Sequence, residues 1–147
     1  MIVLKLVNKS YCLQEICESN YAKLFGLIPN LLTIREQAVA RLRGKPALRV
    51  KITDRTRYTI TLELTHCFQD ELRTVFEPVI KVRLYLDAQA AEVVQHQGPS
   101  PKAHDSFLKA REFMERKWSH NYFLDKWLSY CLQLGYDFNN GSIDLVS

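Results

Sequence analysis

The segment KVRLYLDAQAAEV (Lys81–Val93) describes two β-strands that fold back on each other. Apolar and polar residues alternate on each side of Asp87-Ala88, as they do in strands with one buried face. A two-residue turn at Asp87-Ala88 predicts three cross-strand pairs: Leu84 with Ala91, Val82 with Val93, and Arg83 with Glu92. The opposite charges of the last pair contribute only about 0.2–1 kcal/mol, so they specify the register more than they stabilise the hairpin.

A second hairpin is predicted from Ala47 to His66. Apolar side chains occupy alternate positions of both strands: Leu48, Val50 and Ile52 in the first, and Tyr58, Ile60, Leu62 and Leu64 in the second. An odd-length loop at Asp54–Thr56 places Ile52 opposite Tyr58 and keeps both apolar sets on one face. Val50 then lies opposite Ile60. A two-residue loop would turn the two sets to opposite faces, which a one-sided core does not allow.

Amphipathic helices are predicted before and after this four-stranded meander. Ser10–Leu27 carries apolar residues at helical spacing, and Pro29 ends the helix because proline cannot continue it. Asp105–Lys117 and Asn121–Leu134 predict two helices or one bent helix, with Gly135 as a C-cap. The last helix has a wide apolar stripe: Phe123, Leu124, Trp127, Leu128, Cys131 and Leu132. The expected fold is a single α+β domain over residues 8–135, a four-stranded antiparallel meander with the helices packed on one face.

The segment Leu31–Gly44 allows two interpretations. Thr33 and Glu36 form a capping-box pattern and Gly44 suits the residue after a helix, which together favour a helix. The β-branched residues and the alternation in TIREQAVARL are also compatible with an edge strand. Helix is the preferred interpretation.

Three further segments are read as connections or ends. Cys67–Pro78 predicts a connection with a helical turn at Asp70–Val75. Met1–Val7 is interpreted as a flexible extension or a short strand. Tyr136–Ser147, which contains Asn-Asn-Gly, is interpreted as a turn followed by a C-terminal tail.

The composition fits one globular domain. The chain has 147 residues, of which 47% are hydrophobic and 24% charged, close to the average of globular proteins. The apolar run MIVLKLV is too short to span a bilayer, contains Lys5 and lacks the features of a signal peptide. The cysteines form no CxxC pair, so reduced thiols are expected at Cys12, Cys17, Cys67 and Cys131. Together these observations predict a cytoplasmic protein with no membrane association.

The two hairpins gather basic side chains on the sheet face opposite the apolar set. The candidates for ligand contact on this face are Arg49, Lys51, Arg57, Lys81, Arg83, Tyr85 and Glu92, and Tyr58 and Asp87, which lie beside the turns, are added to them. A basic face that is rich in hydroxyl groups suits a phosphate, a nucleotide or single-stranded nucleic acid. The same composition is also typical of an ordinary solvated sheet face. Because Tyr85 is the one aromatic residue counted on this face, base stacking is poorly supported and nucleic acid is the weakest of these ligands.

Signatures of catalysis and of metal binding are absent from the sequence. It contains no GxSxG, Walker, GxGxxG or HExxH motif. His66-Cys67 has no second Cys or His at ligand spacing, so His66 is interpreted as a hydrogen-bonded imidazole at a strand end. No catalytic residue, metal or cofactor is therefore predicted.

Aromatic residues crowd the last predicted helices. Aromatic residues at helical spacing are usually part of the core, but Trp118 and Tyr122 exceed what one apolar stripe requires. These two residues are the candidate patch for a protein partner.

Three motifs resemble the YqiB-like family of bacterial cytoplasmic proteins. They are CESNYAKLFGLIP (Cys17–Pro29), TRYTITLEL with VRLYLDAQAAEV (Thr56–Val93), and HNYFLDKWLSYCLQLG (His120–Gly135). The resemblance begins at Asn8 and leaves Met1–Val7 outside it. The resemblance implies no defined activity, because none is established for the family.

The resemblance also bears on a site and on a functional context. Family members share a Gln-Arg-Asp-Glu-Lys segment before the last helix, which corresponds here to Phe113–Lys117, where only Glu115 and Lys117 match. Genes of the family often lie near those of nucleotide-hydrolysing enzymes, which implies a nucleotide-linked role by association.

The expected function is that of a non-enzymatic binding or adaptor module. It would use the basic sheet face or the aromatic helical patch to contact a protein partner or a small acidic ligand. A phosphate- or nucleotide-binding protein, including an enzyme of nucleotide metabolism, is the alternative, and nucleic-acid binding is the third hypothesis.

Overall fold

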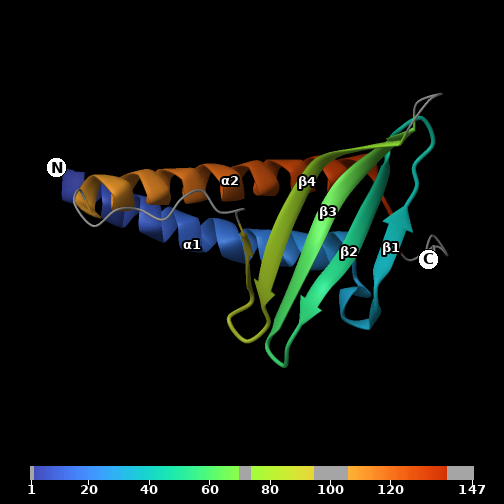
Figure 1. The fold of residues 1–147 in the computed structure, drawn as a ribbon, viewed down its shortest axis with the longest axis horizontal. Coiled ribbons are helices and arrows are strands. Elements are labelled where there is room, and N and C mark those ends of the chain that lie inside the picture. Colours follow the sequence, from blue (N-terminus) through green and yellow to red (C-terminus); the bar gives the residue numbers. More distant parts are fainter. Residues whose placement is uncertain (1, 70–73, 95–105, 139–147) are drawn as a thin grey trace.

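The computed structural model of the chain describes residues 2–69, 74–94 and 106–138, and it shows a sheet with two long helices along one of its faces (Figure 1). The helices are α1 (Ile2–Leu27) and α2 (Ser106–Leu134), and a short 3₁₀ helix, η1 (Leu31–Thr33), follows α1. The strands are β1 (Gln37–Ala40), β2 (Ala47–Arg55), β3 (Thr59–Gln69), β4 (Thr74–Tyr85) and β5 (Ala90–Val93). The predicted α+β class is confirmed.

The sheet has five antiparallel strands in the order β1-β2-β3-β4-β5, so the predicted number of four is wrong. The additional strand is β1, in the segment 31–44 that was preferred as a helix. Ala38 is fully buried, and the carbonyl oxygen of Glu36 accepts a hydrogen bond from the N–H of Ile52. Pairing with β2 and burial of Ala38, Val39 and Ala40 therefore override the local capping pattern. Gly44, with φ of +78°, lies in the turn between β1 and β2.

In the hairpin of β2 and β3, even-numbered residues pair with even-numbered residues before the bulge, as predicted, but the partners differ from the predicted ones. Ile52 lies opposite Leu62 instead of Tyr58, because the strands are longer than expected and the connection is Thr56–Tyr58. The predicted partner of Val50 is wrong by the same four residues. A β-bulge after Ile52 then shifts the register by one residue toward the hairpin loop. Even-numbered residues before the bulge still share one face, which is what the core requires.

The hairpin of β4 and β5 has the predicted register. All three expected pairs are present: Val82 with Val93, Arg83 with Glu92, and Leu84 with Ala91. The connection comprises Leu86–Gln89, four residues and not two, and Gln89 has a positive φ of 54°. The predicted connection over 67–78 is wrong where it is described, because β3 continues to residue 69 and β4 begins at residue 74. Residues 70–73 of the expected helical turn lie outside the described residues.

The two helices lie side by side and run in the same direction (Figure 1). Lys23 of α1 pairs with Asp125 of α2 at 2.7 Å, and its Nζ also donates to Ser129 at 2.7 Å. The hydroxyl of Ser19 donates to the same carboxylate at 2.8 Å. The N-terminal halves of α1 and α2 extend past the β5 edge of the sheet (Figure 1). No helix in the described part of the chain has the length and apolar character that crossing a membrane requires.

The structure corrects the predictions for the start of α1 and for the segment after α2, and it confirms Gly135 as the C-cap of α2. α1 begins at Ile2, so residues 2–7 are helical and are neither a strand nor an extension. α2 is one continuous helix. Gly135 caps it with φ of +89°, and the N–H of Tyr136 reaches the carbonyl oxygen of Cys131, as in a Schellman motif. Tyr136 and Phe138 are buried, so the start of the expected tail belongs to the core, and residues 139–147 lie outside the described residues.

The hydrophobic core fills the space between the inner sheet face and the helices. Its fully buried side chains include Leu24, Ile28, Leu48, Val50, Leu62, Leu64, Val82, Leu84, Leu124 and Leu128. Burial of each such side chain contributes roughly 1.5–3 kcal/mol relative to leaving it exposed. These residues come from α1, α2 and the central strands, so the core joins both layers.

A polar junction ties the helix pair to the β5 edge. The Asn121 side chain accepts a hydrogen bond from the N–H of Val93 at 2.8 Å and donates to the carbonyl oxygen of Lys117 at 2.8 Å. Asn20 donates to the carbonyl oxygen of Asn121 at 3.3 Å. Both asparagines are fully buried. A side chain of α2 therefore supplies the hydrogen-bond acceptor for a backbone N–H of the edge strand β5.

Replacing the buried Asn121 with alanine is expected to lower the free energy of unfolding by about 1–3 kcal/mol, because the partly buried N–H of Val93 loses its acceptor. Urea denaturation measures the loss, and hydrogen exchange of the Val93 amide should become faster. Gln133→Ala, at an exposed position of the same helix, is the control and should change stability by less than about 0.5 kcal/mol. Equal stabilities of the two variants would contradict this role of Asn121.

Two glycines should respond to alanine with opposite signs. Gly26 lies in α1, where an added Cβ would meet only Leu132 at an ordinary 3.8 Å, so Gly26→Ala should stabilise the fold by about 0.5–1 kcal/mol. Gly135→Ala should destabilise it by roughly 1–2 kcal/mol because its φ is left-handed. Thermal and urea unfolding of both variants measure this difference. A stabilising Gly135→Ala would show that the Schellman cap is not maintained.

Candidate functional site

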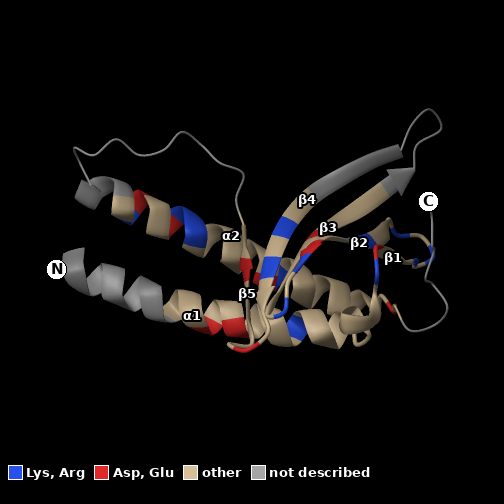
Figure 2. Ribbon diagram, turned by 60° about the horizontal axis from the view of Figure 1, so that its bottom comes forward, with Lys and Arg blue, Asp and Glu red and all other residues tan. Residues whose placement is uncertain are grey.

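The sheet face that points away from the helices, here called the outer face, carries most of the predicted ligand residues. The outer face comprises Arg49, Lys51, Thr61, Glu63, Thr65, Val79, Lys81, Arg83, Tyr85 and Glu92. Figure 2 shows the helices on the other side of the sheet and marks the Lys and Arg positions along β4. Four basic residues on this face stand against two carboxylates, which leaves the face with a positive charge.

Lys51, Glu63 and Lys81 form one row across the outer face, here called the lysine row. Lys51 pairs with Glu63 across β2 and β3, and Glu63 pairs with Lys81 across β3 and β4. Among the described residues, neither lysine forms a salt bridge. With two strand spacings between them, the Cα atoms of the lysines lie roughly 10 Å apart. Within the described part of the chain, neither ammonium group has an ionic partner that a ligand would have to displace.

A second group of outer-face residues is engaged in a network of its own. The hydroxyl of Tyr85 donates to Glu92 at 2.7 Å, and Lys117 of α2 pairs with the other oxygen of Glu92 at 2.8 Å. The Nε of Arg83 donates to Thr61 at 3.3 Å, so its side chain extends across β3. Burial and the Glu92 carboxylate raise the pKa of Tyr85. The network fastens β5 to α2, and it gives Tyr85 and Glu92 a structural role.

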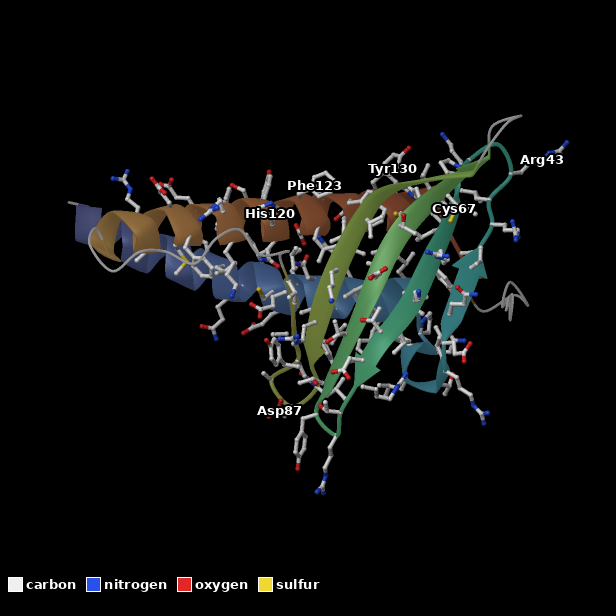
Figure 3. All side chains as sticks on the ribbon, viewed as in Figure 1. Arg43, Cys67, Asp87, His120, Phe123 and Tyr130 are labelled. Atoms are coloured by element: carbon white, nitrogen blue, oxygen red, sulfur yellow. The ribbon has the colours of Figure 1, made fainter. Side chains whose placement is uncertain are left out.

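The remaining three predicted ligand residues lie at the hairpin loops, apart from the lysine row. The Arg57 guanidinium lies over the Tyr58 ring, with 5.3 Å between its Cζ and the ring centroid. The Asp87 carboxylate accepts a hydrogen bond from the N–H of Ala88 at 3.0 Å, and Figure 3 places Asp87 at the loop end of the sheet. Lys81 is four residues from the end of β4, so the loops stand about 13 Å from the lysine row. The structure does not combine these residues into one site.

An arginine of β2 has a role that the sequence pattern did not indicate. The bulge after Ile52 rotates Arg55 to the position opposite Ile60, where its guanidinium donates to the carbonyl oxygens of Leu32 and Ile34 at 3.3 Å and 2.6 Å. Arg55 thus holds the segment between η1 and β1 against the sheet. No local signal could have revealed it, because the contact depends on the bulge.

The aromatic patch predicted on the last helix lies on α2, away from the outer face. The Trp118 and Tyr122 rings stack with 5.0 Å between centroids and 9° between planes, and Lys126 lies over Tyr122 at 5.2 Å. Tyr122 is 42% exposed. Phe123 was expected in the core stripe but is 51% exposed, and Tyr130 is exposed as well (Figure 3). The stripe is therefore narrower than predicted, because only the side toward α1 and the sheet is covered.

His66 and Cys131 form part of the core and are not poised for chemistry. The His66 ring packs edge-on against Trp127 with 4.9 Å between centroids, and its Nε2 lies 3.9 Å from the Cys131 sulfur. Burial lowers the pKa of His66 and raises that of Cys131 to about 12, so the imidazole and the thiol are both held neutral. The described residues contain no group of three or more potential metal ligands.

The two matching residues of the Phe113–Lys117 segment lie within α2 and not before it. Glu115 forms an (i, i+4) pair with Arg111 at 3.5 Å, and Lys117 pairs with Glu92. Both residues thus take part in contacts that support helix and sheet edge. Cys17, near Glu92, has its pKa raised to about 11 by burial, which keeps this thiol protonated.

The lowered pKa of His66 predicts how stability depends on pH. The unfolded chain, with a His66 pKa near 6.5, binds a proton that the folded state resists, so stability is complete above pH 6.5 and falls as the pH drops below it. His66→Phe should make urea unfolding less dependent on pH between 7 and 5, by at most about 1.4 kcal/mol per pH unit. His120→Phe, on the surface of α2, is the control, and identical pH profiles for wild type and His66→Phe would refute the assignment.

The comparisons with known proteins identify a family and no closer relative. No curated protein and no solved structure matches the chain. The family model described as "Protein of unknown function (DUF1249)" matches residues 23–137, which include the C-terminal end of α1, the whole sheet and all of α2. Because the match covers more than half of the sequence, the chain belongs to this family.

Proposed function

We propose that the protein is a non-enzymatic binding module whose outer sheet face contacts an acidic partner. The observation that carries the proposal is the lysine row, in which Lys51 and Lys81 flank Glu63 and have no ion pair within the described chain. Arg49 and Arg83 add positive charge on either side of this row. A positive surface of this kind attracts an acidic partner and lowers the probability of binding a basic one.

The surroundings of the candidate reactive groups also favour binding over catalysis. Burial raises the pKa values of the Cys17, Cys67 and Cys131 thiols, so the nucleophilic thiolate form is disfavoured in each. Tyr85 and Glu92, the strongest polar contact on the outer face, hold β5 to the rest of the fold. The outer face is therefore better suited to recognition than to proton transfer.

A small phosphate or nucleotide is the second candidate ligand. Lysine ammonium groups bind phosphate oxygens as point charges, and Arg83 lies two residues from Lys81 on the same strand face. The gene-neighbourhood association of the YqiB-like proteins points in the same direction. Membership of that narrower family, a bacterial source and a cytoplasmic location are part of the proposal, and the three motifs that resemble the family support them.

Reversing the charge of the lysine row tests the proposal. Lys51→Glu combined with Lys81→Glu should weaken binding of poly-L-glutamate by roughly tenfold or more, because two attractive contacts become repulsive. The control combines Arg43→Glu with Lys45→Glu, which changes the net charge equally in the exposed turn between β1 and β2. Titration calorimetry at several salt concentrations measures the affinities, which should fall as salt rises.

Three outcomes distinguish the possibilities. Selective loss of poly-L-glutamate binding in the lysine-row variant supports the proposal. Equal losses in both variants would reduce the interaction to a general effect of net charge and refute it. Binding of inorganic tripolyphosphate but not of poly-L-glutamate would favour the phosphate ligand, and the same variant would show whether that ligand uses the lysine row.

A further inference from the structure

We infer that the partner is a polypeptide segment that carries acidic side chains next to an apolar side chain. This inference rests on the proposed function, since it names the partner of the same outer face. It comes from a feature that charge alone does not explain, the exposed valine beside the lysine row.

Val79 is an apolar contact point on the outer face. It is 56% exposed, while Ile80, its neighbour on the inner face of β4, is 7% exposed. Val79 pairs with Thr65, and Lys81 follows two residues later on the same face. Residues i and i+2 of a strand lie about 7 Å apart, so the valine and the Lys81 ammonium can be contacted together.

The row that contains Val79 is less charged than the lysine row. It runs from Val79 to Thr65 and then to Arg49, and Thr65 is 1% exposed although it lies on the outer face. Thr65, the residue directly beside Val79, therefore presents little polar surface to a ligand, while Arg49 keeps a positive charge at the far end of the row. An apolar side chain placed over Val79 and Thr65 would cover little exposed polar surface.

The arrangement of charges also restricts the ligand. Glu63 lies between the two lysines and repels a carboxylate placed directly above it. A ligand with one phosphate would contact both lysines from above the middle of the row, where Glu63 lies. A polypeptide can place separate carboxylates over Lys51 and Lys81 and an apolar side chain over Val79, so it fits all three features.

Two peptides of equal charge test the inference. One repeats Glu-Leu-Glu-Gly three times and the other repeats Glu-Ser-Glu-Gly three times, each with blocked termini. The leucine peptide should bind the wild-type protein roughly tenfold more tightly, because each leucine that covers Val79 removes apolar surface from water. Fluorescence anisotropy of labelled peptides measures both affinities.

Val79→Thr should abolish the preference for the leucine peptide and leave the affinity for the serine peptide unchanged. Threonine keeps the β-branched shape that suits a strand, so the fold of β4 is maintained. Leu32→Thr, which alters an exposed leucine of η1, is the matched control and should retain the preference.

The possible results separate this inference from the proposed function. Equal binding of the two peptides by the wild type, or a preference that survives Val79→Thr, overturns the inference. The proposed function would still stand if Lys51→Glu with Lys81→Glu removed binding of both peptides. Failure of both peptides to bind also overturns the inference, whether or not tripolyphosphate binds. Peptide binding that does not depend on Lys51 and Lys81 overturns both the inference and the proposed function.

Discussion

The contact between the Asn121 side chain and the backbone of Val93 is the constraint on which the arrangement of the molecule depends. An edge strand presents unpaired backbone groups, and a helix side chain here supplies one of the missing partners. The same asparagine meets Asn20 of α1 within the parallel helix pair. A buried polar contact of this kind costs stability when it is misaligned, so it favours one axial alignment of α1, α2 and β5.

Alignment of β5 has consequences for the outer face. Glu92 of β5 accepts a hydrogen bond from Tyr85 and pairs with Lys117 of α2. The position of α2 therefore influences where Glu92 and Tyr85 lie on the outer face. This engagement offsets part of the positive charge near β5 and does not involve Lys51 or Lys81. The binding properties proposed for the outer face thus depend on residues that never touch the ligand.

The existence of both hairpins and the register of β4 and β5 were predictable from the sequence, while the register of β2 and β3 was not. Period-two alternation around a short turn defined the register of β4 and β5, and parity placed the basic residues of β2 and β4 on one face. For β1, the strand was the less favoured of two interpretations, because its four residues acquire strand geometry by pairing with β2. The bulge at Ile52 leaves no signature in alternation, so the inward position of Arg55 was equally hidden. Lys117 and Asn121 were missed as tethers because their partners lie on other elements.

The parallel course of α1 and α2 determines the order in which the molecule can be completed. The whole sheet separates the two helices in the sequence, yet they pack directly on each other. On the ribosome, at about 5–20 residues per second, the apolar side of α1 therefore waits several seconds before its partner has been synthesised. During that interval the apolar side of α1 lacks the contacts that α2 supplies, so packing of α1 on α2 is expected late in the folding of the domain.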